Sequence, residues 1–241
     1  AKVISLTKNE YTTTETTGVG SRRTALLTTV WNYKYTGEGG LCPSFPCSTA
    51  KRMKTEFTYD TYGNRSYAVS HGDFDIPGDE TLVWDYYVPN PTPYIVGLLG
   101  ARFVYSGTSA VFANLKTAEN HAYDGAASWG TAPTKGDRTS SQYYMPDLAR
   151  YTNPTTYAYD SYGNVTSVTD PTGGTQTILY DALNLFPSST TQASETTTTA
   201  FDPVCGVVKT LKDPNDVTTT FTADDLCRPW LTQSSAAGTV E

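Results

Sequence analysis

The feature that most constrains this chain is a short repeat in its C-terminal half. An aspartate that follows an aromatic residue recurs at Tyr159-Asp160, Tyr180-Asp181 and Phe201-Asp202, and a degenerate copy lies at Ala223-Asp224. The spacings between these marks are 21, 21 and 22 residues. A fixed period of this size is the signature of architectures in which each repeat is one supersecondary unit that packs against its neighbours.

One repeat is typical of two short strands and two turns. Residues 155–160 alternate tyrosines with other residues, and Gly163 and Asn164 then supply the positive φ angles that tight hairpins need. A β-branched run over residues 165–169 predicts the second strand, after which the Asp-Pro-Thr-Gly sequence beginning at Asp170 turns the chain back. Successive units are therefore expected to pair antiparallel into a growing, twisted sheet.

The same signature lies in the N-terminal half, less regularly. Residues 57–64 nearly duplicate residues 157–164, and Tyr123-Asp124 is a weaker mark. The candidate site residues are those expected to build the repeat turns: Tyr59, Asp60, Gly63, Asn64, Tyr159, Asp160, Gly163, Asn164, Tyr180, Asp181, Phe201 and Asp202. Their predicted role is structural.

The stretch between the two clear marks is irregular. Residues 81–88 and 94–105 are strand-like, and residues 128–137 have the glycine and proline content of a loop. Residues 109–120 fit either a short helix or a strand. No helical period is sustained over three turns, so an all-β chain is expected.

No clear shift of composition separates the two halves, which favours one continuous β assembly over two domains. We expect an irregular β lead-in segment over residues 1–56. A Tyr-Asp repeat region then covers residues 57–241, with an irregular insertion at residues 65–156.

Composition supports a folded chain and excludes two classes of function. Hydrophobic residues make up 38% of the chain and charged residues 17%, against roughly 25% charged in average globular chains, which disfavours disorder. The net charge of −7 argues against nucleic-acid binding, which needs a concentrated basic face. No apolar stretch reaches the roughly 18 residues that a membrane span needs.

Residues that could carry chemistry are sparse. His71 and His121 are the only histidines, and neither belongs to a metal-ligand pattern, so His71 is expected in a polar loop. Asp213 and Asp216 are close in sequence, but Asp213 occupies a repeat turn, which favours a structural role over calcium binding. We therefore expect no catalysis, no metal and no cofactor.

The four cysteines form two pairs in sequence. Cys42 and Cys47 could close a small disulfide loop in an oxidising compartment, and the sequence leaves that open. Cys205 and Cys227 lie one repeat apart, so two strand spacings, roughly 9–10 Å, should separate them. Because a disulfide needs Cα atoms within about 7 Å, these two are predicted to be free thiols.

The Tyr-Asp-x-x-Gly-Asn unit at a period of 21 residues resembles the YD repeat of bacterial Rhs proteins. The segment from Tyr157 to Pro214 is similar to the repeats of the B component of Tc insecticidal toxin complexes. Residues 90–98 and 133–137 also fit that component, and the resemblance covers most of the chain from about Phe57 onward.

The resemblance implies a curved sheet that is part of a hollow β-shell around a cytotoxic C-terminal domain. The implied partners are the remainder of the toxin shell (the C component or C-terminal Rhs repeats) and the enclosed toxin. The implied location is secreted or extracellular, in bacteria. The letters at Asp170 match the family's Asp-Pro-x-Gly self-cleavage segment, but repeats continue beyond them, so Asp170 is expected to be a turn residue.

The leading hypothesis is a non-catalytic structural segment of a toxin-complex shell that encapsulates and helps deliver a cytotoxic domain. The alternative is a cell-surface adhesion or carbohydrate-binding β module, because exposed tyrosines and tryptophans can stack on sugars. Regular placement of tyrosines before each turn favours the first hypothesis, whereas an exposed aromatic cluster in a groove would favour the second.

Overall fold

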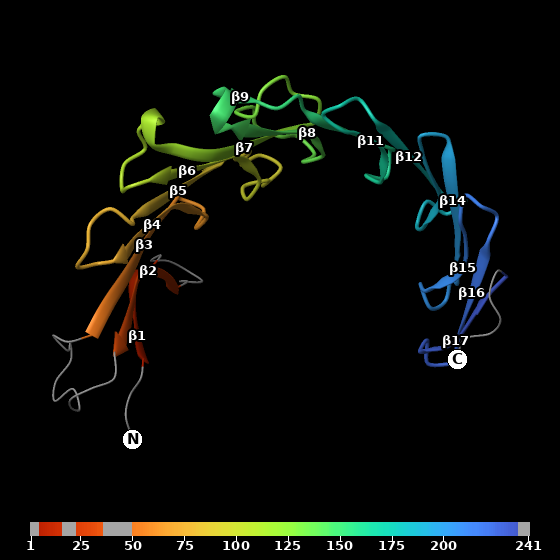
Figure 1. Cartoon of the computed structure of the whole chain (residues 1–241), viewed down its shortest axis with the longest axis horizontal. Helices are drawn as coiled ribbons and strands as arrows, with labels where there is room; N and C mark the ends of the chain where they lie inside the picture. The colour runs from red at the N-terminus through yellow and green to blue at the C-terminus, as the bar shows by residue number, and fades with distance from the viewer. Residues whose placement is uncertain (1–4, 16–22, 36–49, 236–241) are drawn as a thin grey trace. The chain divides into compact units, whose positions relative to one another are not determined.

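The computed structural model describes residues 5–15, 23–35 and 50–235. Its regular structure is antiparallel β apart from two single 3₁₀ turns, Phe112–Asn114 (η1) and Pro146–Leu148 (η2) (Figure 1). The predicted all-β class built from antiparallel hairpins is thereby confirmed. Within the described ranges, no helix is long and apolar enough to cross a membrane.

The chain divides into two compact units. The first unit holds Ala1–Gly136 and Gln142–Thr152, and the second holds Asp137–Ser141 and Asn153–Glu241. The division falls inside the irregular insertion and passes through strand β8 (Arg138–Met145), which contributes residues to both units. The regular 21-residue period therefore belongs to the second unit.

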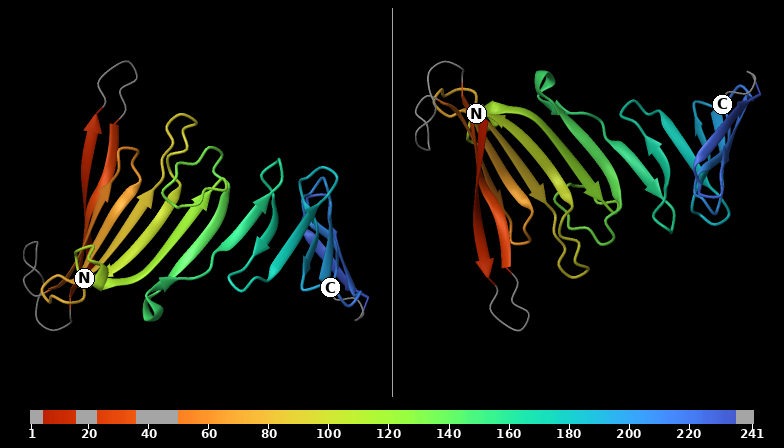
Figure 2. Two further views of the ribbon diagram at one scale, coloured as in Figure 1. Left: turned by 90° about the horizontal axis from the view of Figure 1, so that it is seen from above. Right: turned by 90° about the horizontal axis from the view of Figure 1, so that it is seen from below.

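The first unit is a meander of mostly long strands, seen from red to green in Figure 2. Strands β1 to β7 pair antiparallel in chain order, and β8 pairs with β9. Their bounds are β1 Ser5–Glu15, β2 Arg23–Tyr35, β3 Ala50–Tyr59, β4 Arg65–Asp73, β5 Thr81–Tyr87, β6 Leu99–Ser106, β7 Leu115–Tyr123 and β9 Arg150–Tyr151.

Cross-strand pairs and one long loop give the first unit a core. Leu82 and Tyr105 lie opposite each other on β5 and β6 and are only 3% and 6% exposed. Ala101 is fully buried, and a Cβ on Gly100 would lie 2.6 Å from the carbonyl oxygen of Trp129. The other buried apolar residues in the described ranges are Tyr33, Ala50, Ala68, Val88, Ala118, Ala122, Tyr123 and Pro133. The loop after β7 therefore covers part of the sheet.

The second unit is a series of short hairpins. Residues of β8 pair with β10, and each strand from β10 to β17 then pairs antiparallel with the next. The bounds are β10 Thr155–Tyr159, β11 Val165–Thr169, β12 Thr175–Tyr180, β13 Pro187–Gln192, β14 Glu195–Phe201, β15 Val208–Lys212, β16 Thr218–Ala223 and β17 Pro229–Ser234. Each repeat thus supplies two strands, as its turn signals predict.

The second unit has no comparable core. None of its residues from 153 to 235 is buried, although many are half-buried. Val168, Ile178 and Leu211 share one face of the sheet by register, and threonines such as Thr177 share the other. Because apolar burial is limited here, other interactions must hold the hairpins in register.

In the first unit one local expectation is wrong, and another, left open between a helix and a strand, resolves mainly to a strand. The strand expected over residues 94–105 begins only at Leu99, because Asn90 and Ile95 exchange backbone hydrogen bonds (2.8 and 2.9 Å) that close a loop before it. Residues 109–120 contain the single turn η1 and then strand β7, so no regular helix forms there.

Candidate functional site

The Tyr-Asp marks build one kind of hairpin loop. After β10, the Asp160 carboxylate accepts hydrogen bonds from the backbone N–H groups of Tyr162 (2.8 Å) and Asn164 (2.9 Å). The Asp160 N–H donates to the Asn164 carbonyl (2.9 Å), and the Gly163 N–H donates to the Asp160 carbonyl (3.3 Å). The carboxylate thus pairs backbone donors that the tight turn would otherwise leave unpaired.

The loop after β3 repeats this geometry in the first unit. The Asp60 carboxylate accepts hydrogen bonds from the N–H groups of Tyr62 and Asn64, both at 2.9 Å. Gly63 and Gly163 have φ angles of 87° and 88°, in the left-handed region. A Cβ at either position would meet nothing within 4 Å, so the backbone angle and not the space favours glycine.

Turns at the other end of the hairpins use the same cap. The Asp170 carboxylate accepts hydrogen bonds from the N–H groups of Thr172 (2.8 Å) and Gly174 (3.0 Å). Asp213 accepts the two equivalent bonds, both at 2.9 Å. Asp170 and Asp213 therefore lie in turns and bind their own backbone.

Capping lowers the pKa values of Asp160 and Asp170. Hydrogen bonds from Thr172 and Gly174 hold the pKa of the Asp170 carboxyl below its ordinary value. At Asp160, burial raises the pKa, but the hydrogen bonds from Asn164 and the other loop amides outweigh it and the net pKa is lowered. The charged form is the one that the loops stabilise.

The tyrosine of a mark ties its strand to the neighbouring strand. Its hydroxyl donates to a backbone carbonyl of that strand, and the four bonds are Tyr59 to Leu27, Tyr123 to Leu99 and Tyr159 to Arg138, each 2.8 Å, and Tyr180 to Val165 at 3.2 Å. Phe201 and Ala223 lack the hydroxyl, so this tie cannot form at the last two marks.

Successive loops are also joined to one another. In the second unit, the Asn164 side-chain amide donates to the Asn184 carbonyl in the next loop (2.9 Å). In the first unit, the Asn64 amide donates to the Val96 carbonyl (2.7 Å). The asparagine that ends the Tyr-Asp loop therefore has a second partner outside its own hairpin.

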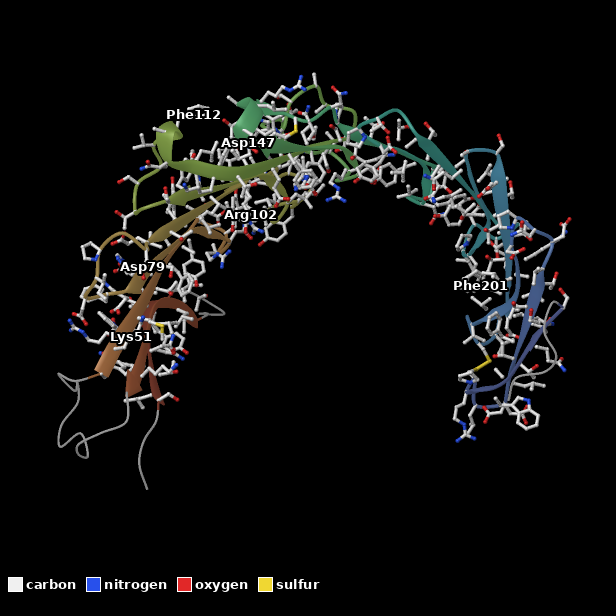
Figure 3. All side chains as sticks on the ribbon, viewed as in Figure 1. Lys51, Asp79, Arg102, Phe112, Asp147 and Phe201 are labelled. Atoms are coloured by element: carbon white, nitrogen blue, oxygen red, sulfur yellow. A yellow bond between two sulfur atoms is a disulfide. The ribbon has the colours of Figure 1, made fainter. Side chains whose placement is uncertain are left out.

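The next loop is joined by aromatic stacking. Phe186 ends the loop that begins at Asp181, and its ring lies 4.7 Å from that of Phe201 with an angle of 14° between the ring planes. A Cβ on Gly206 would lie 3.7 Å from the same Phe186 ring. Phe201 (labelled in Figure 3) thus replaces a tyrosine hydroxyl bond with a ring contact.

The last two loops are joined covalently, which corrects the prediction of free thiols. Cys205 and Cys227 form a disulfide, with Cα atoms 5.3 Å apart. The prediction applied the strand-to-strand spacing, but both cysteines lie in the loops between strands and not in the hydrogen-bonded ladder. Loops of successive hairpins lean together, so two strands per repeat and a disulfide between repeats are compatible. Cys42 and Cys47 lie outside the described residues.

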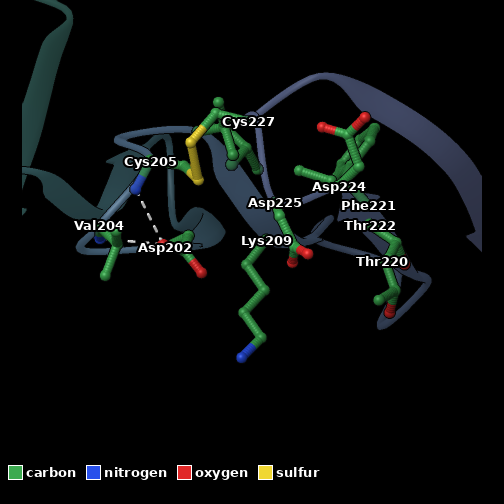
Figure 4. A pocket seen from close by; sticks show the side chains of 13 residues that line it. Asp202, Val204, Cys205, Lys209, Thr220, Phe221, Thr222, Asp224, Asp225 and Cys227 are labelled. Atoms are coloured by element: carbon green, nitrogen blue, oxygen red, sulfur yellow. Dashed lines mark hydrogen bonds between the residues drawn. A yellow bond between two sulfur atoms is a disulfide. The ribbon is translucent and has the colours of Figure 1, made fainter.

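Cys227 occupies a backbone position that glycine fills elsewhere. Its φ angle is 63°, and it stands three residues after Asp224, as Gly163 stands after Asp160. A non-glycine residue in this region costs about 1 kcal/mol. The two cysteines line an open surface depression of about 450 Å³ together with Asp202 and Asp225 (Figure 4).

The tips of the Tyr-Asp loops expose apolar side chains. The residue two positions after the aspartate is Tyr162, Leu183, Val204 or Leu226 in the second unit, with 66% to 89% of its surface exposed. At the opposite hairpin ends the same position holds polar residues, Thr172 and Asn215. A row of exposed apolar groups therefore follows one end of the hairpins.

Two groups in the first unit were missed by the sequence analysis. The Asp85 carboxylate is 2% exposed and is paired with Arg102 (2.5 Å, labelled in Figure 3) and Arg65 (3.1 Å). Asp124 accepts hydrogen bonds from the N–H groups of Thr134 and Lys135, which fixes the loop after β7. Only the weak Tyr123-Asp124 mark signalled the second group.

The histidine expected in a polar loop lies in a strand. His71 belongs to β4, and its Nε2 is 2.5 Å from a carboxylate oxygen of Glu56 on β3. Its ring also lies 5.8 Å from the ring of Phe74. Among the described residues, no three histidine, cysteine or acidic side chains are grouped so that they could hold a metal ion.

Comparison with known proteins gives a fold and no sequence relative. No protein-family model matches the chain, and no curated protein matches it significantly. Solved structures do match: a TcdB2-TccC3 chain has a TM-score of 0.68 at 12% sequence identity, covering 96% of this chain. A chain of the Photorhabdus luminescens Tc holotoxin pore has a TM-score of 0.66 at 12% identity and the same coverage.

The chain has the fold of these Tc toxin chains. It spans only 16% of the length of the first and 15% of the second. The Tc resemblance that the Tyr-Asp marks suggest is therefore confirmed for the fold. At this sequence identity the match shows the arrangement of the strands.

Proposed function

We propose that this chain is a structural segment of a bacterial toxin-complex shell, which encapsulates and helps deliver a cytotoxic domain. The segment performs no chemistry of its own. It forms part of the shell wall. Its hairpins have ends that aspartates cap and loops that are joined to the neighbouring loops. The complex it belongs to is secreted, and its partners are the remainder of the shell and the enclosed toxin.

The observation that carries the proposal is the match to Tc toxin chains over 96% of this chain, combined with the loop geometry. The strands of a shell wall must resist separation. The contacts between its hairpins must also allow further hairpins to be added. The Asp160 cap, the Tyr159 hydroxyl bond and the Asn164 amide bond are all local to one repeat and its neighbour. Such contacts extend to any number of repeats.

The row of exposed apolar loop tips supports a partner at that end of the hairpins. Val204 is 89% exposed and Leu226 is 72% exposed. Apolar rows that face water at this level mark interaction surfaces in soluble proteins. We assign the partner as another part of the same shell, which buries these side chains on assembly.

Carbohydrate binding is less well supported. Tyr67 and Trp84 stack with their ring centroids 5.7 Å apart, and Phe103 lies 5.3 Å from Trp84. The faces of these rings contact one another, so they are not open for a sugar to stack on. Trp230 is exposed and lies on β17, in the second unit.

The test is to purify the full-length protein that contains this chain with the proteins encoded beside it, and to image the complex by cryo-electron microscopy. The proposal expects a closed particle with these strands in its wall and a cytotoxic domain inside. An open assembly, or this segment projecting from the particle, would contradict it. Binding to a glycan array without a closed particle would favour the adhesion module.

Substitutions at the loop tips test the partner surface separately. Leu183→Ser and Leu226→Ser together should weaken assembly of the particle while leaving the circular dichroism of the full-length protein unchanged. The matched control is Thr172→Ser with Asn215→Ser, at the same loop position on the other end of the hairpins. Equal assembly by both pairs of variants would remove the loop tips from the interface.

A further inference from the structure

The disulfide encloses the strands nearest the end of the second unit. The covalent loop from Cys205 to Cys227 contains β15 and β16, and β17 then pairs with β16. At the preceding marks the corresponding join is noncovalent, through Asn164 or Phe186. The bond therefore replaces a contact that this part of the chain lacks.

Apart from the backbone ladders between these strands and the Asp224 cap within its own loop, the contacts found at the preceding marks are missing here. Ala223 has no ring or hydroxyl with which to reach the neighbouring strand, and Trp230 on β17 is 70% exposed. None of the residues from 208 to 235 is buried. Elements with few buried apolar contacts open at low free energy unless something constrains them.

The bond lies beside an open surface depression. Cys205 and Cys227 are both half-buried and line the open depression, and Figure 4 draws the sulfur–sulfur bond among the side chains that line it. The backbone of Cys227 lies in the left-handed region, where glycine is the ordinary residue. Once the bond is cut, this strained φ angle favours a change of the loop conformation.

We propose that the Cys205–Cys227 disulfide is a thiol-reducible latch, which holds β15, β16 and β17 in register and releases them on reduction. The inference does not depend on the proposed function, since it concerns the stability of this segment alone. Its consequence is a chain whose last repeats are rigid in an oxidising compartment and loosened in a reducing one.

The chemistry is thiol–disulfide exchange with a dithiol as reductant. A dithiol thiolate attacks one sulfur of the bridge, forms a mixed disulfide and displaces the other cysteine as a thiolate. The second dithiol sulfur then displaces the first cysteine, and the dithiol leaves as a cyclic disulfide. Two electrons pass to Cys205 and Cys227, and the two protons that the dithiol loses protonate the two cysteines.

The test is hydrogen–deuterium exchange of the full chain, followed by mass spectrometry, with and without dithiothreitol. Alkylation and peptide mapping in the same samples show whether Cys205 and Cys227 have become free thiols. Peptides from residues 208–235 should exchange at least about tenfold faster after reduction, because the latch is the main constraint on local opening. Peptides from residues 155–192 and from β5 to β7 should be unchanged.

Two variants separate the bond from other effects. Cys205→Ser with Cys227→Ser should exchange like the reduced protein and should ignore dithiothreitol, and because it keeps Cys42 and Cys47 it also controls for any reduction there. Cys205→Ser with Cys227→Gly should exchange more slowly than the serine pair, since glycine relieves the backbone angle. Two results would overturn the latch. The first is a Cys205–Cys227 disulfide that dithiothreitol does not reduce in the folded chain. The second is unchanged hydrogen exchange of residues 208–235 once both cysteines are free thiols.

Discussion

The two units of this chain are built from the same antiparallel hairpins but are held together in different ways. In the first unit, Leu82 and Tyr105 are buried against each other and a long loop carries Trp129 onto the sheet. In the second, no residue from 153 to 235 is buried, and the contacts are capped turns, stacked rings and one disulfide. A repeated sheet can therefore keep its register either through a core or through its hairpin ends.

The two units should therefore be vulnerable to different changes. Apolar burial is insensitive to protons and reductants, so the first unit should respond mainly to changes of side-chain volume. Carboxylate caps and a disulfide depend on charge and redox state, so the second unit should respond to pH and thiols.

The largest expected effect is on the core of the first unit. Leu82→Ala should destabilise it by about 2–5 kcal/mol, because it removes a buried side chain and leaves a cavity. The matched change in the second unit is Leu179→Ala, where the leucine is 62% exposed and the cost should stay below about 1 kcal/mol. Urea unfolding of the full chain, followed by hydrogen exchange in each unit, measures both, and equal losses would remove the contrast.

The next largest effect is that of the disulfide. Replacing Cys205 and Cys227 by serine should cost the repeats that the bond encloses about 3 kcal/mol, since a closed loop of this length restricts the unfolded chain. The first unit should keep its urea midpoint. A shift of both units together would show that they unfold as one and that the bond is not a local constraint.

Acid should destabilise the second unit more than the first, by a smaller difference than the two changes above. The pKa values of Asp160, Asp170, Asp202 and Asp224 are lowered in the folded second unit, so their stabilisation is present above the unfolded pKa and is lost as pH falls through the folded value. Among the described residues of the first unit, the carboxyl pKa values lowered are those of Glu56 and Asp75. Circular dichroism from pH 5 to pH 2, with hydrogen exchange by unit, should show earlier loss in the second.

The smallest effects are expected at the left-handed loop positions. Gly163→Ala should destabilise the second unit by about 1 kcal/mol, because alanine is strained at that φ. Asn184→Gly, at the equivalent position of the next loop, should stabilise it by a few tenths to about 1 kcal/mol. Thermal unfolding measures the pair, and changes of the same sign would show that the backbone angle does not decide these positions.

Much of the second unit could be predicted because its determinants are local. The hairpins follow from alternation and from aspartate and glycine at fixed spacing, as at Asp160 and Gly163. The Cys205–Cys227 bond could not be predicted, because it depends on how close two loops come to each other beyond the ends of their strands. In the first unit, the pairing of Asp85 with two arginines depends on which strands become neighbours. The residues around Asp85 in the sequence do not indicate those neighbours.

The most direct measurement of the central contrast is native-state hydrogen exchange of the full chain at rising urea, resolved by peptide. The account predicts that β5 to β7 are protected up to the global transition of the first unit. The second unit should open below that limit, hairpin by hairpin, with the repeats enclosed by Cys205–Cys227 among the last to open while oxidised. Protection of the second unit equal to that of β5 to β7, and unaffected by reduction, would contradict the claim that its hairpin ends hold it together.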